Sequence, residues 1–218
     1  MALGDALGSL EQLVREHLPS EVIIDYKGQS EDYKSTGGAI LFTFLLGIVV
    51  VFLVLAAQFE SWIHPFVIML TVPLAMVGAL LGLYLTDQTL NIYSQIGLIM
   101  LVGLSAKNGI LIVEFANQLR DAGRPFREAL IEASEIRLRP IIMTGITTAA
   151  GSMPLLLSSG AGTETRTVIG TVVLCGILSA TIFTLFVVPV AYDLLARHSG
   201  SPKRVQRQLD RELEASDQ

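Results

Sequence analysis

Five long apolar stretches, separated by short polar segments, occupy most of the chain. They cover about residues 39–58, 65–85, 92–119, 140–159 and 168–195. Each is close to the roughly 20 residues that a helix needs to cross the hydrocarbon core of a bilayer. The pattern therefore predicts an all-α polytopic membrane protein with five transmembrane helices in a domain covering residues 39–195.

The first 38 residues have a different pattern. Apolar residues recur at helical spacing over residues 3–18, Pro19 ends that pattern, and VIIDY at 22–26 has the composition of a short strand, before a polar, turn-rich stretch at 27–38. One helix and one strand cannot bury a core of their own. We therefore interpret residues 1–38 as a small remnant of a larger soluble domain.

The segment between the third and fourth apolar stretches is also periodic. Apolar residues at helical spacing alternate there with glutamates and arginines. This predicts an amphipathic helix over about residues 123–137, lying along the membrane surface. After the last apolar stretch, residues 196–218 mix acids and bases and are predicted to be a tail in water.

Lysines and arginines are unevenly divided between the two sides of the predicted bundle. The third-to-fourth segment and the tail share one side and carry Arg120, Arg124, Arg127, Arg137, Arg139, Arg197, Lys203, Arg204, Arg207 and Arg211, whereas the other side carries Arg15, Lys27, Lys34 and Arg166. Positive residues accumulate on the cytoplasmic side of membrane proteins. The C-terminus is therefore predicted to be cytoplasmic and the N-terminal segment to lie on the outer side.

Composition narrows the class of protein further. Apolar residues make up 51% of the chain and charged residues only 16%, below the roughly 25% of soluble domains. The net charge of −5 gives no electrostatic basis for binding nucleic acid, and the single Cys175 excludes an intrachain disulfide and a cysteine-based metal site. No hydrolase, kinase or metal-binding signature is visible, so we expect neither an enzyme nor a bound metal or cofactor.

Lys107 is the residue that this pattern does not explain. It lies with Asn108 inside the third apolar stretch, with apolar residues for more than two turns on both sides. A charge at this depth costs about 2.5–3.5 kcal/mol, and such residues usually serve an ion or proton pathway. The alternative is a lysine that extends to the headgroups, which works near the end of a helix.

A buried lysine also needs a carboxylate partner. Glu114 lies two turns away, about 10 Å along the helix, and Asp193 lies near the end of the last stretch. We therefore expect the partner to come from helices outside this chain. Thr144 and Arg137 are the other candidates. Thr144 is expected only about one turn inside its stretch, so it could meet Lys107 only through the long lysine side chain, a tilt or ordered water. Arg137 is equally well explained as a positive residue at the cytoplasmic boundary.

Several motifs resemble one transporter family. They are LAAQFESW at 55–62, VPLAMVGALLGL at 72–83, the segment 91–120 with its SAKN sequence, RLRPIIMTG at 137–145 and FVVPVAYDLL at 186–195. The chain resembles resistance-nodulation-division (RND) multidrug efflux transporters of the acriflavine-resistance type, the hydrophobe/amphiphile efflux branch of Gram-negative inner membranes. The likeness runs from about residue 3 to residue 195.

This resemblance implies that the chain is the C-terminal part of such a pump. Its five stretches would be the eighth to twelfth of twelve spans, and residues 1–38 a periplasmic remnant of a porter domain. Lys107 would interact with two aspartates of the fourth span, which this chain lacks. Thr144 and Arg137 would join the same proton relay, with Asn108 and Ser105 as candidates for supporting roles.

The family also implies an energy source and partners. The proton gradient would drive transport, drugs would bind in the absent porter domain, and the pump would be a homotrimer in lipid with a periplasmic adaptor and an outer-membrane channel. This chain would supply the lysine side of the relay and would not pump without the missing N-terminal part. The alternative is a small structural or regulatory membrane protein that associates with full-length pumps. A protein-export or lipid transporter of the same superfamily is disfavoured by the match at 91–120.

Overall fold

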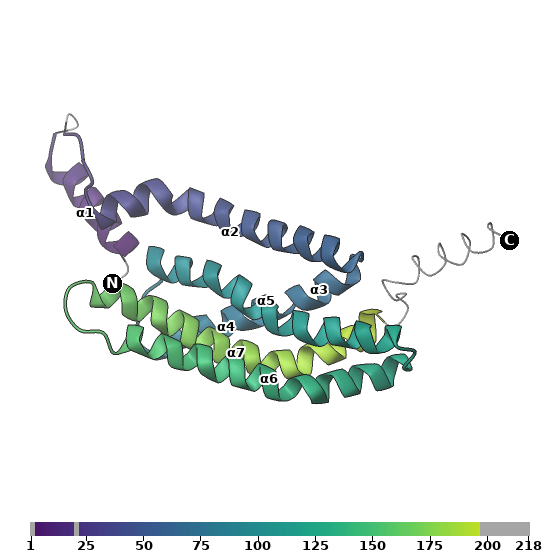
Figure 1. Cartoon of the computed structure of the whole chain (residues 1–218). Helices are drawn as coiled ribbons and strands as arrows, with labels where there is room; N and C mark the ends of the chain where they lie inside the picture. Colours follow the sequence, from purple (N-terminus) through teal and green to yellow (C-terminus); the bar gives the residue numbers. More distant parts are fainter. Residues whose placement is uncertain (1–2, 20–21, 197–218) are drawn as a thin grey trace.

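A computed structural model describes residues 3–19 and 22–196 of the chain, and its regular secondary structure there is entirely helical. The predicted tail lies outside these residues from position 197 on. The helices are α1 (Leu3–His17), α2 (Gln29–Phe59), α3 (Ile63–Met69), α4 (Thr71–Leu85), α5 (Ile92–Asp121), α6 (Phe126–Leu156) and α7 (Thr163–Ala196). In Figure 1, α2 to α7 form an antiparallel bundle, with α3 and α4 together making one pass, and α1 lies at one end.

Helix α1 agrees with the predicted N-terminal helix, but the predicted strand at 22–26 is wrong. These residues form no strand, and the amide of Val22 donates to the carbonyl of Pro19 in a turn. A strand satisfies its backbone through a neighbouring strand, and the described part of the chain contains none. The helix–strand remnant is therefore a helix followed by an irregular segment.

The turn-rich structure predicted for 27–38 is also wrong. Gly28 has a positive φ of 65°, and from Gln29 the chain is helical without a break into the first apolar stretch. The expensive step in helix formation is nucleation, which the long apolar stretch already provides, so each added residue costs little. Helix α2 is otherwise loosely attached, because in its apolar segment Ala39–Phe59 only Leu55 and Phe59 are buried.

The second predicted span is divided into α3 and α4 at Leu70. Pro73 explains the division, because proline has no amide hydrogen to give to the carbonyl four residues earlier and its ring crowds that carbonyl. The hydroxyl of Thr71 donates to the carbonyl of Ile68 at 2.8 Å and satisfies part of the disturbed turn. Together α3 and α4 still provide a membrane-spanning length, Ile63–Leu85.

The third span begins with a capping box. The side chain of Asn91 accepts from the Ser94 amide at 2.9 Å, and the Ser94 hydroxyl accepts from the Asn91 amide at 2.8 Å. These two bonds satisfy backbone groups that would otherwise be unpaired at a helix start. Helix α5 then runs to Asp121 and contains Lys107 near its middle.

Helix α6 corrects two predictions at once. The amphipathic helix at 123–137 and the span at 140–159 are one continuous helix, with Pro140 inside it. The fourth span was predicted to begin at Pro140, where the apolar stretch begins. Ala129 and Ala133 before the proline and Ile141 and Gly145 after it are all buried. A buried face that continues past Pro140 favours the uninterrupted helix.

Within residues 3–19 and 22–196, four helical segments are long and apolar enough to cross a membrane: Ala39–Phe59, Ile63–Leu85, Ile92–Asp121 and Thr163–Ala196. These agree with four of the predicted spans. Helix α6 is not among them, so the count of five is not confirmed by length and composition. Its second half is rich in threonine and glycine, yet it lies beside α7 as a full-length member of the bundle (Figure 1).

Helix α7 is the centre of the packing and contacts α4, α5 and α6. Helix α7 approaches α4 so closely at Gly78 that no larger residue would fit there, because a Cβ at Gly78 would lie 2.0 Å from the Cβ of Ser179. The Ser179 hydroxyl donates across this contact to the carbonyl of Leu74 at 3.0 Å. Small residues at helix contacts are the usual means of packing in a bilayer.

Candidate functional site

Lys107 lines a small crevice between α5 and α6, to which α7 contributes Ile177. The crevice has a volume of about 20 Å³ and is lined by Leu104, Lys107, Asn108, Thr144, Gly145, Thr148 and Ile177. The structure thus brings together three of the residues singled out from the sequence, namely Lys107, Asn108 and Thr144.

The depth of Thr144 was misjudged from the sequence because its helix was expected to start at Pro140. Helix α6 starts at Phe126, so Thr144 lies 18 residues inside it, and Lys107 lies 14 residues before the end of α5 at Asp121. At 1.5 Å per residue these depths are about 27 Å and 21 Å. In antiparallel neighbours the two positions are close to level, and both side chains reach the same crevice.

The polar groups of the crevice differ in how they are held. Asn108 is buried, with 4% of its side chain exposed. The Thr144 hydroxyl donates to the carbonyl of Ile141 at 3.1 Å, and the Thr148 hydroxyl donates to that of Thr144 at 2.8 Å. The hydroxyl hydrogen of each threonine is thus donated to a carbonyl of its own helix. The hydroxyl oxygen can still accept a hydrogen bond from a group in the crevice.

Lys107 is exposed at the surface of the bundle. Within residues 3–19 and 22–196 it forms no ion pair, in contrast to Lys34 and Arg124, which both do. The expected carboxylate partner is therefore not supplied by the described part of this chain. The surface that presents Lys107 is open for a partner from outside it.

Arg137 and Ser105 lie outside the crevice. The guanidinium of Arg137 lies over the ring of Phe115, 4.5 Å from its centre, and its Nε is buried without a hydrogen-bond partner. Phe115 is eight residues beyond Lys107, about 12 Å along α5. Ser105 is fully buried and donates to the carbonyl of Val102 at 3.2 Å. Two residues turn a helix by about 200°, so Ser105 faces away from Lys107.

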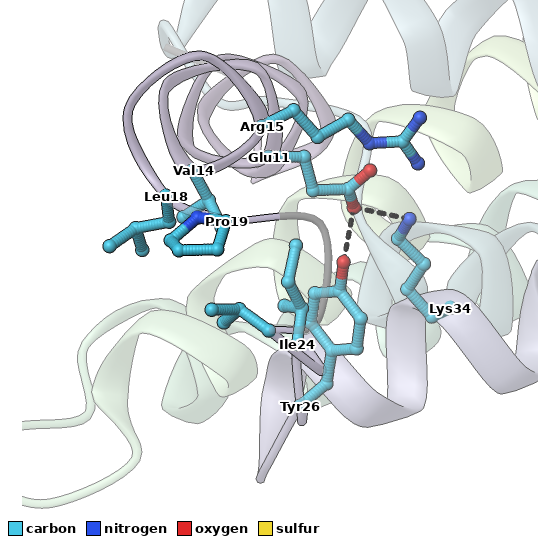
Figure 2. A pocket seen from close by; sticks show the side chains of 9 residues that line it. Glu11, Val14, Arg15, Leu18, Pro19, Ile24, Tyr26 and Lys34 are labelled. Atoms are coloured by element: carbon cyan, nitrogen blue, oxygen red, sulfur yellow. Dashed lines mark hydrogen bonds and ion pairs between the residues drawn. The ribbon is translucent and has the colours of Figure 1, made fainter.

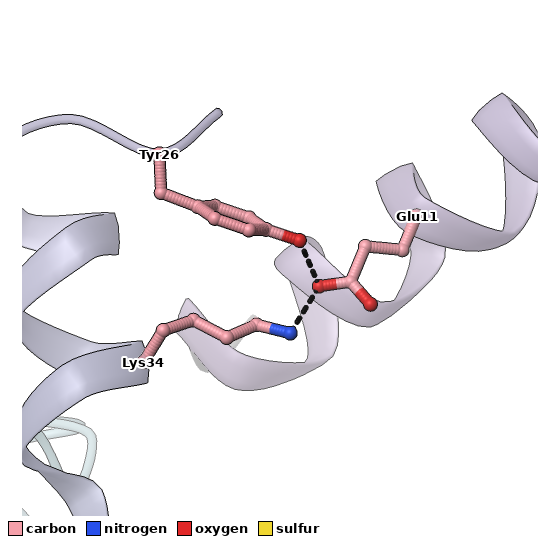
Figure 3. A network of polar contacts seen from close by, with 3 residues as sticks. All are labelled: Glu11, Tyr26 and Lys34. Atoms are coloured by element: carbon pink, nitrogen blue, oxygen red, sulfur yellow. Dashed lines mark hydrogen bonds and ion pairs between the residues drawn. The ribbon is translucent and has the colours of Figure 1, made fainter. Parts of the chain in front are cut away.

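A second polar site lies outside the apolar windows, where α1 meets the start of α2. Figure 3 shows the hydroxyl of Tyr26 and the ammonium of Lys34 both bound to one carboxylate oxygen of Glu11. The ammonium also lies 5.0 Å from the centre of the Tyr26 ring. Figure 2 shows these side chains beside Arg15 and several apolar residues around a pocket of about 560 Å³.

This network changes the titration of its three members. The hydrogen bond from Lys34, followed by that from Tyr26, lowers the pKa of Glu11. The hydrogen bond to Glu11 in turn raises the pKa of Tyr26 and that of Lys34. The ionised carboxylate thus links α1 to α2 through the connecting segment.

A third group, at the opposite end of the bundle, was not found from the sequence. It is a buried set of contacts around the hydroxyl of Tyr192 that includes His64, Asn117 and Arg120. Its members are up to 128 positions apart in the chain, and no local pattern connects them. The single available signal was a histidine, an asparagine and a tyrosine within or beside apolar stretches.

Comparison with known proteins places the whole described chain in one group. The model of the AcrB/AcrD/AcrF family matches residues 1–196. An uncharacterized transporter of Haemophilus influenzae is 45% identical over 200 residues, covering 88% of this chain and 19% of its own length. The toluene efflux pump membrane transporter TtgB of Pseudomonas putida is 41% identical over 91% of this chain and 19% of its own. The multidrug resistance protein MdtF of Escherichia coli is 42% identical over 87% of this chain and 18% of its own. The chain thus spans about a fifth of the length of these relatives.

Proposed function

This chain belongs to the AcrB/AcrD/AcrF family of RND efflux transporters, and from that premise we propose that it is the C-terminal transmembrane part of a proton-driven multidrug pump. In this proposal Lys107 supplies the positive side of the proton relay. The observation that carries it is the exposed position of Lys107 beside Asn108 and Thr144, near the middle of a helix long and apolar enough to cross a membrane and without an ion pair in the described chain.

The relay works through the attraction between Lys107 and carboxylates of another segment of the pump. When those carboxylates are ionised, they hold the ammonium against the α5–α6 surface. When they take up protons the attraction is lost, and α5 can shift relative to its partner. Thr144 offers a hydroxyl oxygen to the ammonium, and Arg137 holds positive charge over Phe115, which lies about 12 Å from Lys107 along α5.

The remaining parts of the proposal concern placement and partners. The protein lies in the bacterial inner membrane, with α6 as a fifth crossing, the N-terminal segment in the periplasm as part of a porter domain, and the C-terminus in the cytoplasm. It acts with the N-terminal part of the pump in a homotrimer that joins a periplasmic adaptor and an outer-membrane channel. By itself the chain does not transport.

Complementation tests this function. The chain is expressed in a drug-sensitive Gram-negative strain together with the N-terminal part of a related pump, and resistance and proton uptake are measured. We expect restored resistance, its complete loss in Lys107→Ala and a reduction in Thr144→Ala. Lys27→Ala, which removes an exposed lysine outside the bundle, is the matched control.

Two outcomes would contradict the proposal. Full resistance in Lys107→Ala would remove the lysine from the relay. If the chain instead lowers resistance when it is expressed beside an intact pump, and never restores it with the N-terminal part, the structural or regulatory role is the correct one.

A further inference from the structure

The Tyr192 hydroxyl lies at the centre of a closed polar cluster at the end of the bundle away from α1. It donates to the side-chain oxygen of Asn117 at 2.6 Å and accepts from Nη1 of Arg120 at 2.9 Å. Nε2 of His64 lies 3.5 Å from the same oxygen. Tyr192 and His64 are fully buried, and Asn117 is 4% exposed.

The number of hydrogen bonds that a phenol can form determines which groups around the Tyr192 hydroxyl donate and which accept. A phenol oxygen has one hydrogen and can accept two bonds. Since the hydrogen goes to Asn117, Arg120 donates, and His64, whose Nε2 lies at the limit of hydrogen-bond distance, can join this oxygen only as a donor with its hydrogen on Nε2. Nδ1 of His64 and the side-chain nitrogen of Asn117 remain buried without a partner. The hydroxyl of Tyr192 is therefore fully used.

Aromatic rings enclose the cluster and bring in two more helices. Phe126, the first residue of α6, stacks on Tyr192 with ring centres 5.4 Å apart and an angle of 7° between the planes. Arg120 lies over the other ring of this pair, 4.8 Å from the centre of Phe126. Phe59, at the end of α2, lies 5.8 Å from His64. In Figure 1 the ends of α2, α5 and α7 and the starts of α3 and α6 meet here.

We infer that this Tyr192 cluster is a polar lock that fixes one end of α5 against α3 and α7, so that α5 can move only by tilting about it. Separating these ends would break the hydrogen bond between the buried Tyr192 hydroxyl and the buried side-chain oxygen of Asn117, which is unfavourable. Asn117 is ten residues from Lys107, about 15 Å along the helix. Tyr192 is thus a positioning residue for the middle of α5.

Spin-label distances test the lock in the full chain, reconstituted in lipid nanodiscs. Replacing the one cysteine, Cys175→Ala, provides a background for labels at the exposed Gln118 on α5 and Leu194 on α7. We expect one narrow distance distribution. Tyr192→Phe keeps the ring stack and removes the hydroxyl, so the distribution should broaden and shift to longer distances. Tyr84→Phe, at a tyrosine that is 84% exposed, is the matched control.

Nitrogen NMR of the His64 ring provides a readout that loss of packing alone would not give. The other two histidines, His17 and His198, are replaced by glutamine so that one ring is observed. We expect the Nε2–H tautomer in the parent chain and a changed tautomer ratio in Tyr192→Phe. A hydrogen on Nδ1 in the parent chain, or a distance distribution that Tyr192→Phe leaves unchanged, would overturn the lock. Neither measurement involves transport, so failure here leaves the role of Lys107 untouched, and the reverse also holds.

Discussion

Replacing Gly78 with alanine should open the contact between α4 and α7. The new Cβ would lie 2.0 Å from the Cβ of Ser179, 2.4 Å from its hydroxyl oxygen and 3.0 Å from the backbone oxygen of Cys175. Unbonded carbon atoms rest about 3.5–4.0 Å apart, so α4 and α7 must separate locally by about 1.5 Å. The backbone oxygen cannot rotate away, and the Cβ of Ser179 can move only with its helix.

Three effects set the change in the free energy of unfolding, two that destabilise and one that stabilises. Overpacking of this kind destabilises by about 1–3 kcal/mol. Separation also lengthens the bond from Ser179 to the carbonyl of Leu74, and such bonds between membrane helices contribute about 0.6 kcal/mol. Alanine favours helix over glycine by up to about 1 kcal/mol. Gly78→Ala should therefore lower the free energy of unfolding by about 1–3 kcal/mol.

Cys175 makes this measurable without introducing a cysteine. It is the one cysteine of the chain and is only partly exposed, and its Sγ lies 2.5 Å from where a Cβ of Gly82 would be, at the same contact. A dye that fluoresces on reaction with a thiol reports the temperature at which α4 and α7 separate. At about 2–4 °C per kcal/mol for a chain of this size, Gly78→Ala should melt several degrees lower.

Gly103→Ala is the matched control for this experiment. Gly103 is also within a membrane helix, but no atom lies within 4 Å of the point where its Cβ would be, so this variant should gain only the helix preference of alanine and melt at or above the parent temperature. Equal melting temperatures for Gly78→Ala and Gly103→Ala would refute the close approach of α4 and α7.

Two further predictions concern other contacts. Gly145→Ala should lower the melting temperature because its Cβ would lie 2.8 Å from the hydroxyl of Thr181, whereas Gly151→Ala, with no atom within 4 Å, should not; a thermal melt compares them. Because the pKa of Glu11 is lowered, its contribution to holding α1 is present above its ordinary value of 4.5 and is lost as the pH falls through the lowered value. Because the pKa of Lys34 is raised, its contribution is present below 10.5 and is lost as the pH rises through the raised value. Proteolysis between α1 and α2 should therefore be slowest between these limits, and Glu11→Gln should abolish the acid-side change; a rate independent of pH in the parent chain would contradict this.

Sequence reasoning succeeded where the determining property is local. The span at 92–119 was predicted within two residues of the end of α5, because a long apolar stretch is almost sufficient to specify a helix in a membrane. Lys107 could be singled out for a similar reason, since the cost of a charge at that depth depends on the sequence around it.

Sequence reasoning failed where contacts between distant segments determine the bounds of a helix or the members of a cluster. The amphipathic segment at 123–137 and the apolar stretch from 140 were predicted as separate helices from their local composition, whereas the buried face of α6 continues across Pro140. The misplaced start then put Thr144 at the wrong depth. His64, Asn117 and Tyr192 meet only after α3, α5 and α7 have packed, so no window of sequence could reveal their cluster.

The sparse burial of α2 has a consequence for how freely its sequence can vary. Leu55 and Phe59 are buried against the bundle, and Val51 packs beside them, so these positions are constrained in shape. Most of the other large apolar side chains of the segment Ala39–Phe59 form an exposed face. The transfer of apolar side chains from water into lipid is favoured in proportion to their apolar area and does not depend on the fit of individual atoms. Leucine, valine, isoleucine and phenylalanine should be interchangeable along this face, and a library of such exchanges should leave folding intact there while failing at Leu55 and Phe59.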